Sequence, residues 1–349
     1  MKDTGLPHPA ARRHFLGVDV GGTKTDVLIA DGTGRAVALA QGGPGNWEAV
    51  GYAGLTRVLQ DTVAQALQTA GLSMVEINGA GMGLAGYDWP SQRQAHLDAI
   101  EPLQLQAPLQ VVNDTVLGLV AGSARGWGVS LVAGTGCNCR GWSRSQPRRE
   151  GRVVGGAGPW SGEAAGAFDI LARAMRAVVF QWTRRGPATA LAAAFMQHTG
   201  AKDLDELIEG TYLGRFWLES SLAKLVFQVA AQGDPQALEV IRWAGSELGQ
   251  MACGVIRQLD LEADEFDLVL VGSLYEGHPL LTESLRSTVQ EVAPGARLVR
   301  LAVPPVVGAV LLGMEAAGLE TQPVRLILME TTGAQLRTHG ADQRKEAAR

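Results

Sequence analysis

The sequence has few cysteines, little net charge and no long apolar run, and each scarcity excludes a class of protein. Three of 349 residues are cysteine, and an odd number of thiols does not indicate a disulfide framework. Lys and Arg total 30 against 35 Asp and Glu, a net charge of -5 without the basic excess of nucleic-acid binders. No apolar run approaches the roughly 20 residues of a membrane-spanning helix. We expect a reducing compartment, no nucleic-acid partner and no membrane.

The chain is long enough for two domains, since single cores seldom grow to this length. Hydrophobic residues make up 46% and charged residues 19%, the balance of a globular enzyme. Residues 1–14 carry charges and prolines without an apolar stretch, so we expect a disordered arm rather than a secretory signal. These features predict a cytoplasmic protein with a small-molecule partner.

Glycine is abundant, with 45 residues, and it falls in clusters that adjoin apolar runs. The pattern predicts tight turns at the ends of buried strands, where glycine permits positive φ and close approach to a ligand. The clusters are Gly21-Gly22, Gly79 to Gly86, Gly134 to Gly136, Gly155 to Gly166 and Gly272.

The first apolar runs predict an antiparallel meander of three strands, over Phe15–Val20, Val27–Ala30 and Ala36–Ala40. No helix follows Gly21-Gly22 directly, and the spacing of a dinucleotide fingerprint is missing. Lys24 also lies outside the frame of a Walker A loop.

The rest of the chain repeats this plan, with a strand and a glycine-threonine turn opening each half. Helical periodicity covers Trp47–Ala70 and Gln92–Ile100, and most of Phe168 to Ala263. Within that last region we expect helices over Ala188–His198, Phe216–Ala231 and Ala237–Leu259. The remaining elements expected are strands at Ile77–Leu84, Leu109–Val112, Gly128–Ala133 and Asp267–Val271, and an apolar helix at Val306–Ala317.

The first glycine turn has the residues of a phosphate site. Backbone N–H groups and Thr23 can donate to phosphate oxygens, while Asp19 can hold a hydrated Mg²⁺ that neutralises them. An ordinary hairpin with a buried aspartate would show the same pattern. The second loop, Gly134-Thr135-Gly136, favours the phosphate interpretation, because two such loops can hold one polyphosphate.

Two other residue types allow more than one interpretation. Asp114 follows a strand, where it can accept the proton of a sugar hydroxyl as general base, and it can also cap a helix over Thr115–Ala124. These two roles are compatible. Cys137 and Cys139, without a second pair, supply too few ligands for zinc.

Taken together, the motifs resemble those of the eukaryotic-type N-acetylglucosamine kinase family, grouped with BadF/BadG-type ATPases in the sugar kinase and actin superfamily. The motifs occur in the family's order over roughly Phe15 to Gly318. They are Gly17-Val-Asp-Val-Gly-Gly-Thr-Lys-Thr25, Gly83-Leu-Ala-Gly86, Asn113-Asp114, Gly134-Thr-Gly-Cys-Asn-Cys-Arg140 and Gly155-Gly-Ala-Gly158.

The resemblance implies an α/β fold of two ribonuclease H-like domains, as in actin-like ATPases, with an interdomain cleft. We place the first domain at 15–115, joined by a C-terminal helix around 306–318. The second domain then covers 116–305 with a helical insertion, and 337–349 form a frayed tail. A homodimer is also implied by the family.

The resemblance further implies an ATP- and Mg²⁺-dependent kinase acting on the 6-hydroxyl of N-acetylglucosamine or glucosamine. Asp114 is then the general base, and Asp19 holds Mg²⁺ through water. The implied ATP-binding residues are Gly21, Gly22, Thr23, Lys24, Gly134, Thr135, Gly136, Gly272 and Ser273, and the implied sugar-binding residues are Asn46, Asn138, Gly156 and Glu163.

The sugar half departs from the family pattern. Gly162-Glu163-Ala164-Ala165-Gly166 replaces the usual Gly-Asp-Glu-Gly-Ser, and Ala157 stands where the family often has tryptophan. The identity of the sugar substrate is therefore left open, and glucose is among the candidates. Two other functions are considered beside the kinase: a BadF-type ATPase that activates an iron-sulfur partner enzyme, and a sensor that binds without turnover.

Overall fold

The computed structural model describes residues 12–145, 147–153 and 162–346, with side chains as far as residue 336. The chain forms two compact units, one of residues 1–126 with 301–349 and one of residues 127–300. The sequence suggested a boundary after residue 115. The first unit extends beyond it because α3 (Asp114–Gly122) packs against α10 (Val306–Ala316) of the same unit.

The structure bears on part of each expected chain end, and residues 1–11 and 347–349 lie outside the described residues. β1 begins at His14, inside the expected arm of residues 1–14. Helix α11 (Arg325–Glu346) continues through residues 337–346, most of the expected frayed tail. Within the part of the chain that the structure describes, we find no helix with the length and apolar character to cross a bilayer.

The first unit is built on a mixed sheet with the strand order β3-β2-β1-β4-β5. β1 and β2 pair antiparallel, as do β2 and β3, so the expected meander is confirmed. β4 and β5 extend the sheet in parallel from the other side of β1. The strands are β1 (His14–Val20), β2 (Thr25–Asp31), β3 (Ala36–Gly42), β4 (Ile77–Leu84) and β5 (Leu109–Asn113), and the further helices are α1 (Trp47–Ala70) and α2 (Arg93–Ile100).

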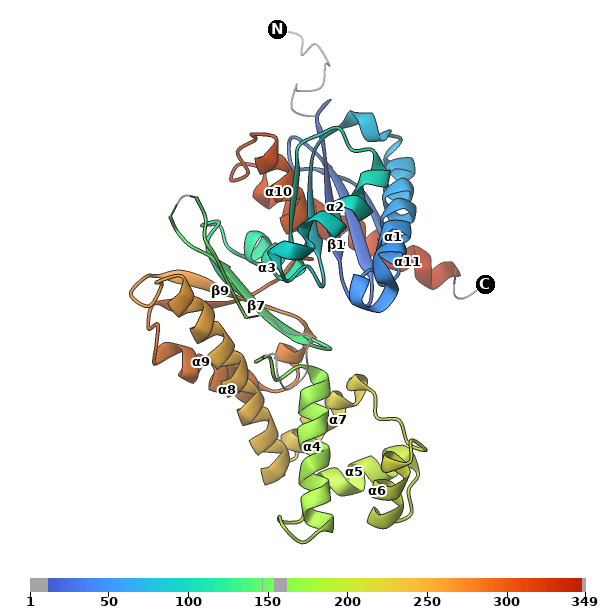
Figure 1. Cartoon of the computed structure of the whole chain (residues 1–349), viewed down its shortest axis with the longest axis vertical. Coiled ribbons are helices and arrows are strands. Elements are labelled where there is room, and N and C mark those ends of the chain that lie inside the picture. The colour runs from blue at the N-terminus through green and yellow to red at the C-terminus, as the bar shows by residue number, and fades with distance from the viewer. Residues whose placement is uncertain (1–11, 146, 154–161, 347–349) are drawn as a thin grey trace. The chain divides into compact units, whose positions relative to one another are not determined.

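Helices pack on both faces of this sheet (Figure 1). On one face, Val18 of β1 shares a buried cluster with Leu55 and Leu59 of α1. On the other, a Cβ on Gly81 would collide with the carbonyl oxygen of Ala309 in α10. Part of the glycine cluster at 79–86 therefore lies inside β4 rather than in a turn, because the helix backbone packs directly on the strand.

The second unit repeats the same arrangement, with the strand order β10-β9-β6-β7-β8. β6 pairs antiparallel with β7 and parallel with β9, as β1 does with β2 and β4. The expected repetition of one plan is thus confirmed, and the loop between β6 and β7 corresponds to the loop between β1 and β2. The strands are β6 (Gly128–Ala133), β7 (Cys137–Trp142), β8 (Glu150–Val153), β9 (Phe266–Val271) and β10 (Ala296–Arg300).

Helices between β8 and β9 form most of the remaining core of this unit (Figure 1). The helix expected over Phe216–Ala231 starts only at Ala223, because the N–H groups of Arg215 and Phe216 donate to the Gly210 carbonyl and close the preceding helix. These helices are α4 (Ala167–Trp182), α5 (Ala190–Thr199), α6 (Leu204–Tyr212), α7 (Ala223–Ala231) and α8 (Pro235–Gln258), and α9 (Pro279–Gln290) follows between β9 and β10.

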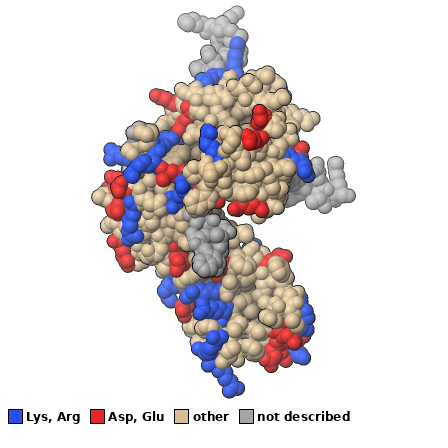
Figure 2. All heavy atoms as spheres, in the orientation of Figure 1, with Lys and Arg blue, Asp and Glu red and all other residues tan. Residues whose placement is uncertain are grey.

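Charged side chains of both signs lie on the surface of each unit. Figure 2 shows Lys and Arg together with Asp and Glu on the visible face of both. The small net charge of -5 is therefore the sum of many opposite charges that are spread over the chain.

Candidate active site

The loop between β1 and β2 is a tight turn with an open tip. The N–H of Gly21 donates to the carbonyl of Lys24 (2.9 Å), which closes the turn. Gly22 and Thr23 are exposed, and a Cβ on Gly22 would meet nothing within 4 Å. The backbone at this tip is therefore accessible to a ligand, as a phosphate loop requires.

The side chain of Lys24 lies against a buried carboxylate that the sequence analysis did not single out. Its Nζ is 2.7 Å from Asp26 Oδ2, and Gln41 Nε2 donates to the other oxygen of Asp26 (2.7 Å). Asp26 is buried in β2, directly opposite Asp19 in the strand register. An aspartate directly before the apolar run Val27–Ala30 was the available signal.

Asp19 at the end of β1 has an unusual electrostatic environment. Burial raises the pKa of its carboxyl well above the ordinary value, the neighbouring Asp114 and Asp26 raise it further, and Lys24 lowers it. Its carboxylate accepts no hydrogen bond from any described residue. A cation placed beside Asp19 would therefore offset an unfavourable cluster of negative charge.

Asp114 is the first residue of α3 and not its cap. The cap is Asn113, whose Oδ1 accepts from the N–H of Thr115 (3.0 Å). Asp114 Oδ1 accepts from the same N–H at 3.0 Å. The helix ends at Gly122 rather than Ala124. A carboxylate in the first turn of a helix is favoured by the helix dipole, which suits an ionised base.

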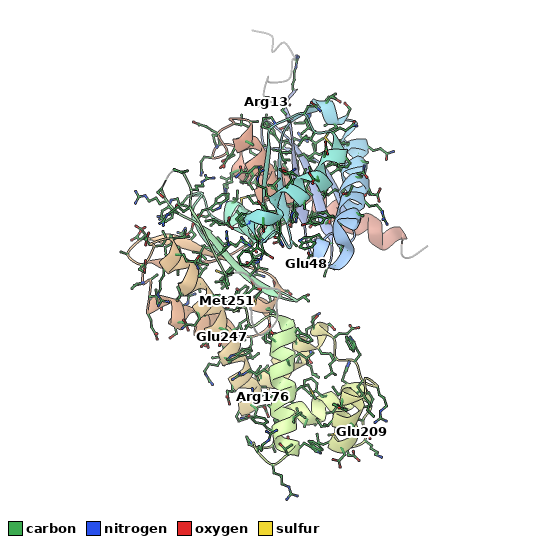
Figure 3. All side chains as sticks on the ribbon, in the orientation of Figure 1. Arg13, Glu48, Arg176, Glu209, Glu247 and Met251 are labelled. Atoms are coloured by element: carbon green, nitrogen blue, oxygen red, sulfur yellow. The ribbon has the colours of Figure 1, made fainter. Side chains whose placement is uncertain are left out.

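Asn46 caps α1, the first helix of this unit. Its Oδ1 accepts from the N–H of Glu48 (3.1 Å), and its Nδ2 donates to the Glu48 carboxylate (3.3 Å). Glu48 is labelled in Figure 3 at the start of this helix. The expected sugar-binding role thus falls on a residue whose capping bonds already orient its amide.

The loop between β6 and β7 rests on the amino terminus of α4. The N–H of Gly134 donates to the carbonyl of Gly136 (2.8 Å), and the carbonyl of Gly134 accepts from the N–H of Ala167 (2.9 Å). Thr135 and Gly136 are exposed. This loop therefore presents a threonine and open backbone, as its counterpart in the first unit does.

Gly272 and Ser273 follow β9 and lie beside this second loop. Gly272 has φ 107° and a Cβ there would collide with the Ala133 carbonyl, so only glycine fits. Arg300 fixes the turn by donating to the carbonyls of Leu270 (2.9 Å) and Gly272 (2.7 Å). Arg300 was not anticipated from the sequence.

The expected sugar residues of the second unit lie around β7. Asn138 is half-buried, and its side-chain oxygen is buried and accepts no hydrogen bond from any described residue. Glu163 is half-buried and lies near enough to Cys137 to raise the thiol pKa. Gly156, with Ala157, lies outside the described residues.

The three cysteines are free and buried. Burial raises the pKa of Cys137, with further contributions from Glu163 and Asp169, and burial also raises that of Cys139. Cys137 Sγ lies 3.9 Å from the sulfur of Met251, which Figure 3 labels. Thiolates are the metal-binding form, so these residues disfavour an iron-sulfur cluster. Among the described side chains, no group of three His, Cys, Asp or Glu residues could hold a metal ion.

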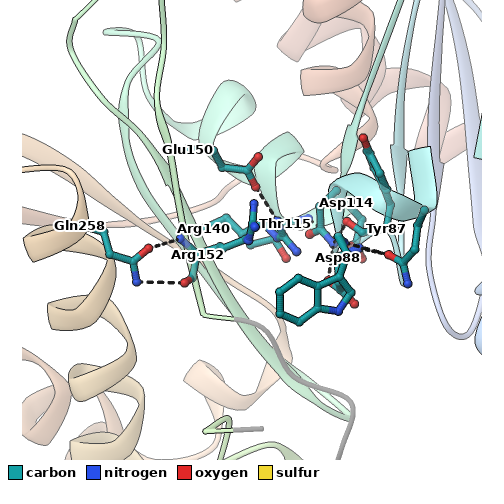
Figure 4. Close-up of polar contacts among 11 residues, drawn as sticks. Tyr87, Asp88, Asp114, Thr115, Arg140, Glu150, Arg152 and Gln258 are labelled. Carbon is teal, nitrogen blue, oxygen red and sulfur yellow. Dashed lines mark hydrogen bonds and ion pairs between the residues drawn. The ribbon is translucent and has the colours of Figure 1, made fainter. Parts of the chain in front are cut away.

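Each unit thus gathers part of the expected set. The first brings together Asp19, Asp114 and the Gly21–Lys24 turn, with Asn46 at the start of α1. The second brings Gly272 next to the Gly134–Gly136 loop. Figure 4 shows the contacts around Asp114 and, separately, the paired hydrogen bonds of Gln258 with Arg152.

Comparison with known proteins agrees with this arrangement. A kinase named for N-acetylmuramic acid and N-acetylglucosamine from Clostridium acetobutylicum is 24% identical over 302 residues, covering 86% of this chain and 98% of that protein. The N-acetyl-D-glucosamine kinase of Dictyostelium discoideum is 26% identical over 316 residues, with the same coverage of 86% and 98%.

A solved structure shows the same fold. The crystal structure of a candidate N-acetylglucosamine kinase from Chromobacterium violaceum matches with a TM-score of 0.62 and 27% identity, covering 87% of this chain and 99% of that one. The expected α/β fold of two ribonuclease H-like domains is confirmed. Residues 16–313 match the family model described as the BadF/BadG/BcrA/BcrD ATPase family, and the chain belongs to that family.

Proposed function

We propose that this protein is an ATP-dependent kinase that phosphorylates the 6-hydroxyl of an amino sugar, N-acetylglucosamine or glucosamine. The observation that carries the proposal is the pairing of Asp114, at the amino terminus of α3, with Asp19 at the end of the strand that precedes the first glycine turn. The two named relatives and the solved structure support the substrate class.

Asp114 acts as the general base. Its carboxylate accepts the proton of the sugar hydroxyl, so that the hydroxyl oxygen can attack the γ-phosphorus while the bond to ADP breaks. The first turn of α3 stabilises the ionised carboxylate before the reaction. The proton ends on Asp114, and the sugar leaves as its 6-phosphate.

Asp19 fits a Mg²⁺ site of a particular kind. It lies among the carboxylates of Asp114 and Asp26 without a hydrogen-bond donor from the described residues, so a divalent cation would lower the local repulsion. Since no described group of three ligands exists, water and phosphate oxygens would complete the shell. Bound there, Mg²⁺ supplies neutralisation of the phosphate charge.

The loops hold the nucleotide in this proposal. Thr23 with the backbone of Gly21 and Gly22, and Thr135 with Gly134 and Gly136, donate to phosphate oxygens, and Gly272 and Ser273 border the adenosine. Lys24, which is paired with Asp26 and has a partly exposed side chain, contributes positive charge near the phosphates.

The sugar contacts are assigned to Asn46, Asn138 and Glu163, with Gly156 outside the described residues. The buried unsatisfied oxygen of Asn138 supports this role, because a sugar hydroxyl would remove its desolvation cost. The proposal also includes a cytoplasmic location, consistent with free thiols, and a homodimer, which rests on the family resemblance alone.

A coupled ADP-release assay over N-acetylglucosamine, glucosamine, glucose and N-acetylmuramic acid tests the proposal. Wild-type protein should turn over at least one of them, and Asp114→Asn should lower kcat by about 10³-fold or more while ATP binding persists. Asp61→Asn, an exposed carboxylate of α1, serves as the matched control. Sugar binding in calorimetry without ADP release would instead favour the sensor.

A further inference from the structure

We propose that the loop Gly86–Asp88, after β4, is the common anchor that sets the distance between Asn46 and Asp114, with Asn113 and Asp88 as positioning residues. The inference rests on the proposed function for its meaning in catalysis. Its geometric basis lies wholly within the first unit, where one loop contacts the residues that hold both side chains.

At one end of the loop, Asn113 uses both halves of its amide. Its Oδ1 accepts from the N–H of Thr115 (3.0 Å), and its Nδ2 donates to the Tyr87 carbonyl and to Asp88 Oδ1, both at 3.2 Å. Asn113 is 3% exposed. The start of α3, and so Asp114, is therefore tied to the loop by a buried side chain that needs both a donor and an acceptor.

The loop itself is held by a side chain of the following helical turn. The N–H groups of Asp88 and Trp89 both donate to Gln92 Oε1, at 2.8 and 2.9 Å. Figure 4 shows the labelled Tyr87, Asp88, Asp114 and Thr115 close together in this network. The carboxylate of Asp88 is thus presented to Asn113 from a fixed backbone.

At the other end of the loop, Gly86 contacts the start of α1. The Trp47 indole Nε1 donates to the Gly86 carbonyl (2.7 Å). Gly86 has φ 78°, and a Cβ there would stand 2.5 Å from Asn46 Oδ1 and 2.8 Å from Trp47 Nε1. Only glycine lets Asn46 lie this close to the loop.

A cluster of aromatic rings also joins this loop to helices α1 and α2. Trp47 stacks on Tyr52 with ring centroids 4.7 Å apart, and His96 stands edge-on to Tyr52 at 5.2 Å. Tyr87 lies 4.9 Å from His96. The loop residue Tyr87 and the helix residue Trp47 thus belong to one packed cluster. A movement of the loop would therefore also move Asn46 and Asp114.

The contacts of Asn113 are tested by replacing its amide, which donates hydrogen bonds, with a carboxylate, which only accepts them. Asn113→Asp keeps a good helix cap but loses both donors and places a carboxylate beside Asp88. We expect kcat to fall between about 10- and 100-fold, since a displacement of about 1 Å can cost that much, with KM for ATP unchanged. Asp88→Asn alone should change kcat less than about threefold, because the amide oxygen can still accept.

The double variant Asp88→Asn with Asn113→Asp reverses donor and acceptor across the same contact. It should recover only part of the lost kcat, because the contact between residues 88 and 113 is restored while the Tyr87 carbonyl still lacks its donor. A double variant no more active than Asn113→Asp, or an Asn113→Asp variant with wild-type kcat, would overturn the inference.

The Gly86 end is tested with a matched glycine. Gly86→Ala should lower kcat/KM for the sugar by about tenfold or more, with KM for ATP within about twofold of wild type. Gly71, with φ 67° and nothing within 4 Å of the position that a Cβ would take, shares the backbone strain without the collision. Gly71→Ala should keep sugar kcat/KM within about twofold. Equal losses in both variants would show general destabilisation and contradict the inference.

Crystal structures of the variants separate this inference from the proposed function. If wild-type protein phosphorylates no sugar, the proposed function fails, but the anchor still predicts a changed Asn46–Asp114 distance. Asn113→Asp should alter it by about 1 Å, and the double variant should show a smaller change. An unchanged distance in Asn113→Asp would overturn the anchor whatever the activity.

Discussion

The carboxylates of Asp19, at the end of β1, and Asp114, at the start of α3, lie close enough that the charge of Asp114 adds to burial in raising the Asp19 pKa. Such a pair of carboxylates is unfavourable in the unliganded protein. A bound divalent cation would remove this repulsion. The two carboxylates therefore lower the stability of the free protein and favour binding of the cation.

Asp19→Asn separates these two states. Without Mg²⁺ and ATP, the variant should unfold at a higher temperature than wild type, because it removes a buried carboxyl whose charged form is disfavoured by burial and by Asp114 and Asp26. With both ligands, its kcat should be lower by about 10²-fold or more. Differential scanning calorimetry and the ADP assay measure the two effects, and a variant less stable than wild type in the absence of ligands would contradict this account.

Arg300→Lys should weaken nucleotide binding. A lysine cannot reproduce the two simultaneous bonds of the guanidinium to the Leu270 and Gly272 carbonyls, so the turn at Gly272 loses its support. We expect KM for ATP to rise about five- to tenfold and KM for the sugar to stay the same. Arg297 lies on β10 with Arg300 and pairs with Asp267 of the neighbouring strand β9. Arg297→Lys is the control and should leave both constants unchanged.

Ala165→Gly should stabilise the protein. Ala165 has φ 95° and is fully buried. Glycine relieves the strain of that backbone region, and part of this gain is offset by the greater freedom of the unfolded chain. The net effect should be about 1 kcal/mol in denaturant unfolding. Gly162→Ala, at φ 75°, should shift stability in the opposite direction.

His96 should make stability depend on pH. Burial lowers its pKa from the ordinary value of 6.5, although the Gln92 carbonyl and Asp88 act in the other direction. The unfolded chain then binds more protons than the native one below pH 6.5, so stability falls as the pH drops through that window, by at most about 1.4 kcal/mol per pH unit.

His96→Phe keeps a ring in the cluster with Tyr52 and Tyr87 and removes the titration. Chemical denaturation at several pH values should show a flatter profile below about pH 6.5 for this variant. Parallel profiles for wild type and variant would show that another group is responsible.

Much of the fold could be predicted because its signals are local. The strand at Ile77–Leu84 and the helix at Trp47–Ala70 have the expected bounds, since apolar periodicity and flanking turn residues define each of them. The short strands β8 and β10 were not expected. Their residues are only partly apolar, and pairing with neighbours distant in sequence makes them strands.

The residues of the candidate site also fall into those with a local sequence signal and those placed by contacts distant in sequence. Asp19, Thr23, Asp114 and Thr135 could be proposed from the sequence, because each stands at a strand end or turn that the local pattern marks. The contact of Lys24 with Asp26, the cap at Asn113 and the support from Arg300 could not. Each depends on strand register or on a partner chosen among many by packing.

The sequence by itself determined that two halves would share one plan of strand, glycine-threonine turn and strand, since turns and apolar runs are encoded within a few residues. Only the tertiary structure decided which polar groups meet. Asp19 gains its raised pKa from burial and from carboxylates on β2 and α3, and one loop joins Asn46 to Asp114, because hydrogen bonds and charges act over a few ångströms of space rather than along the chain.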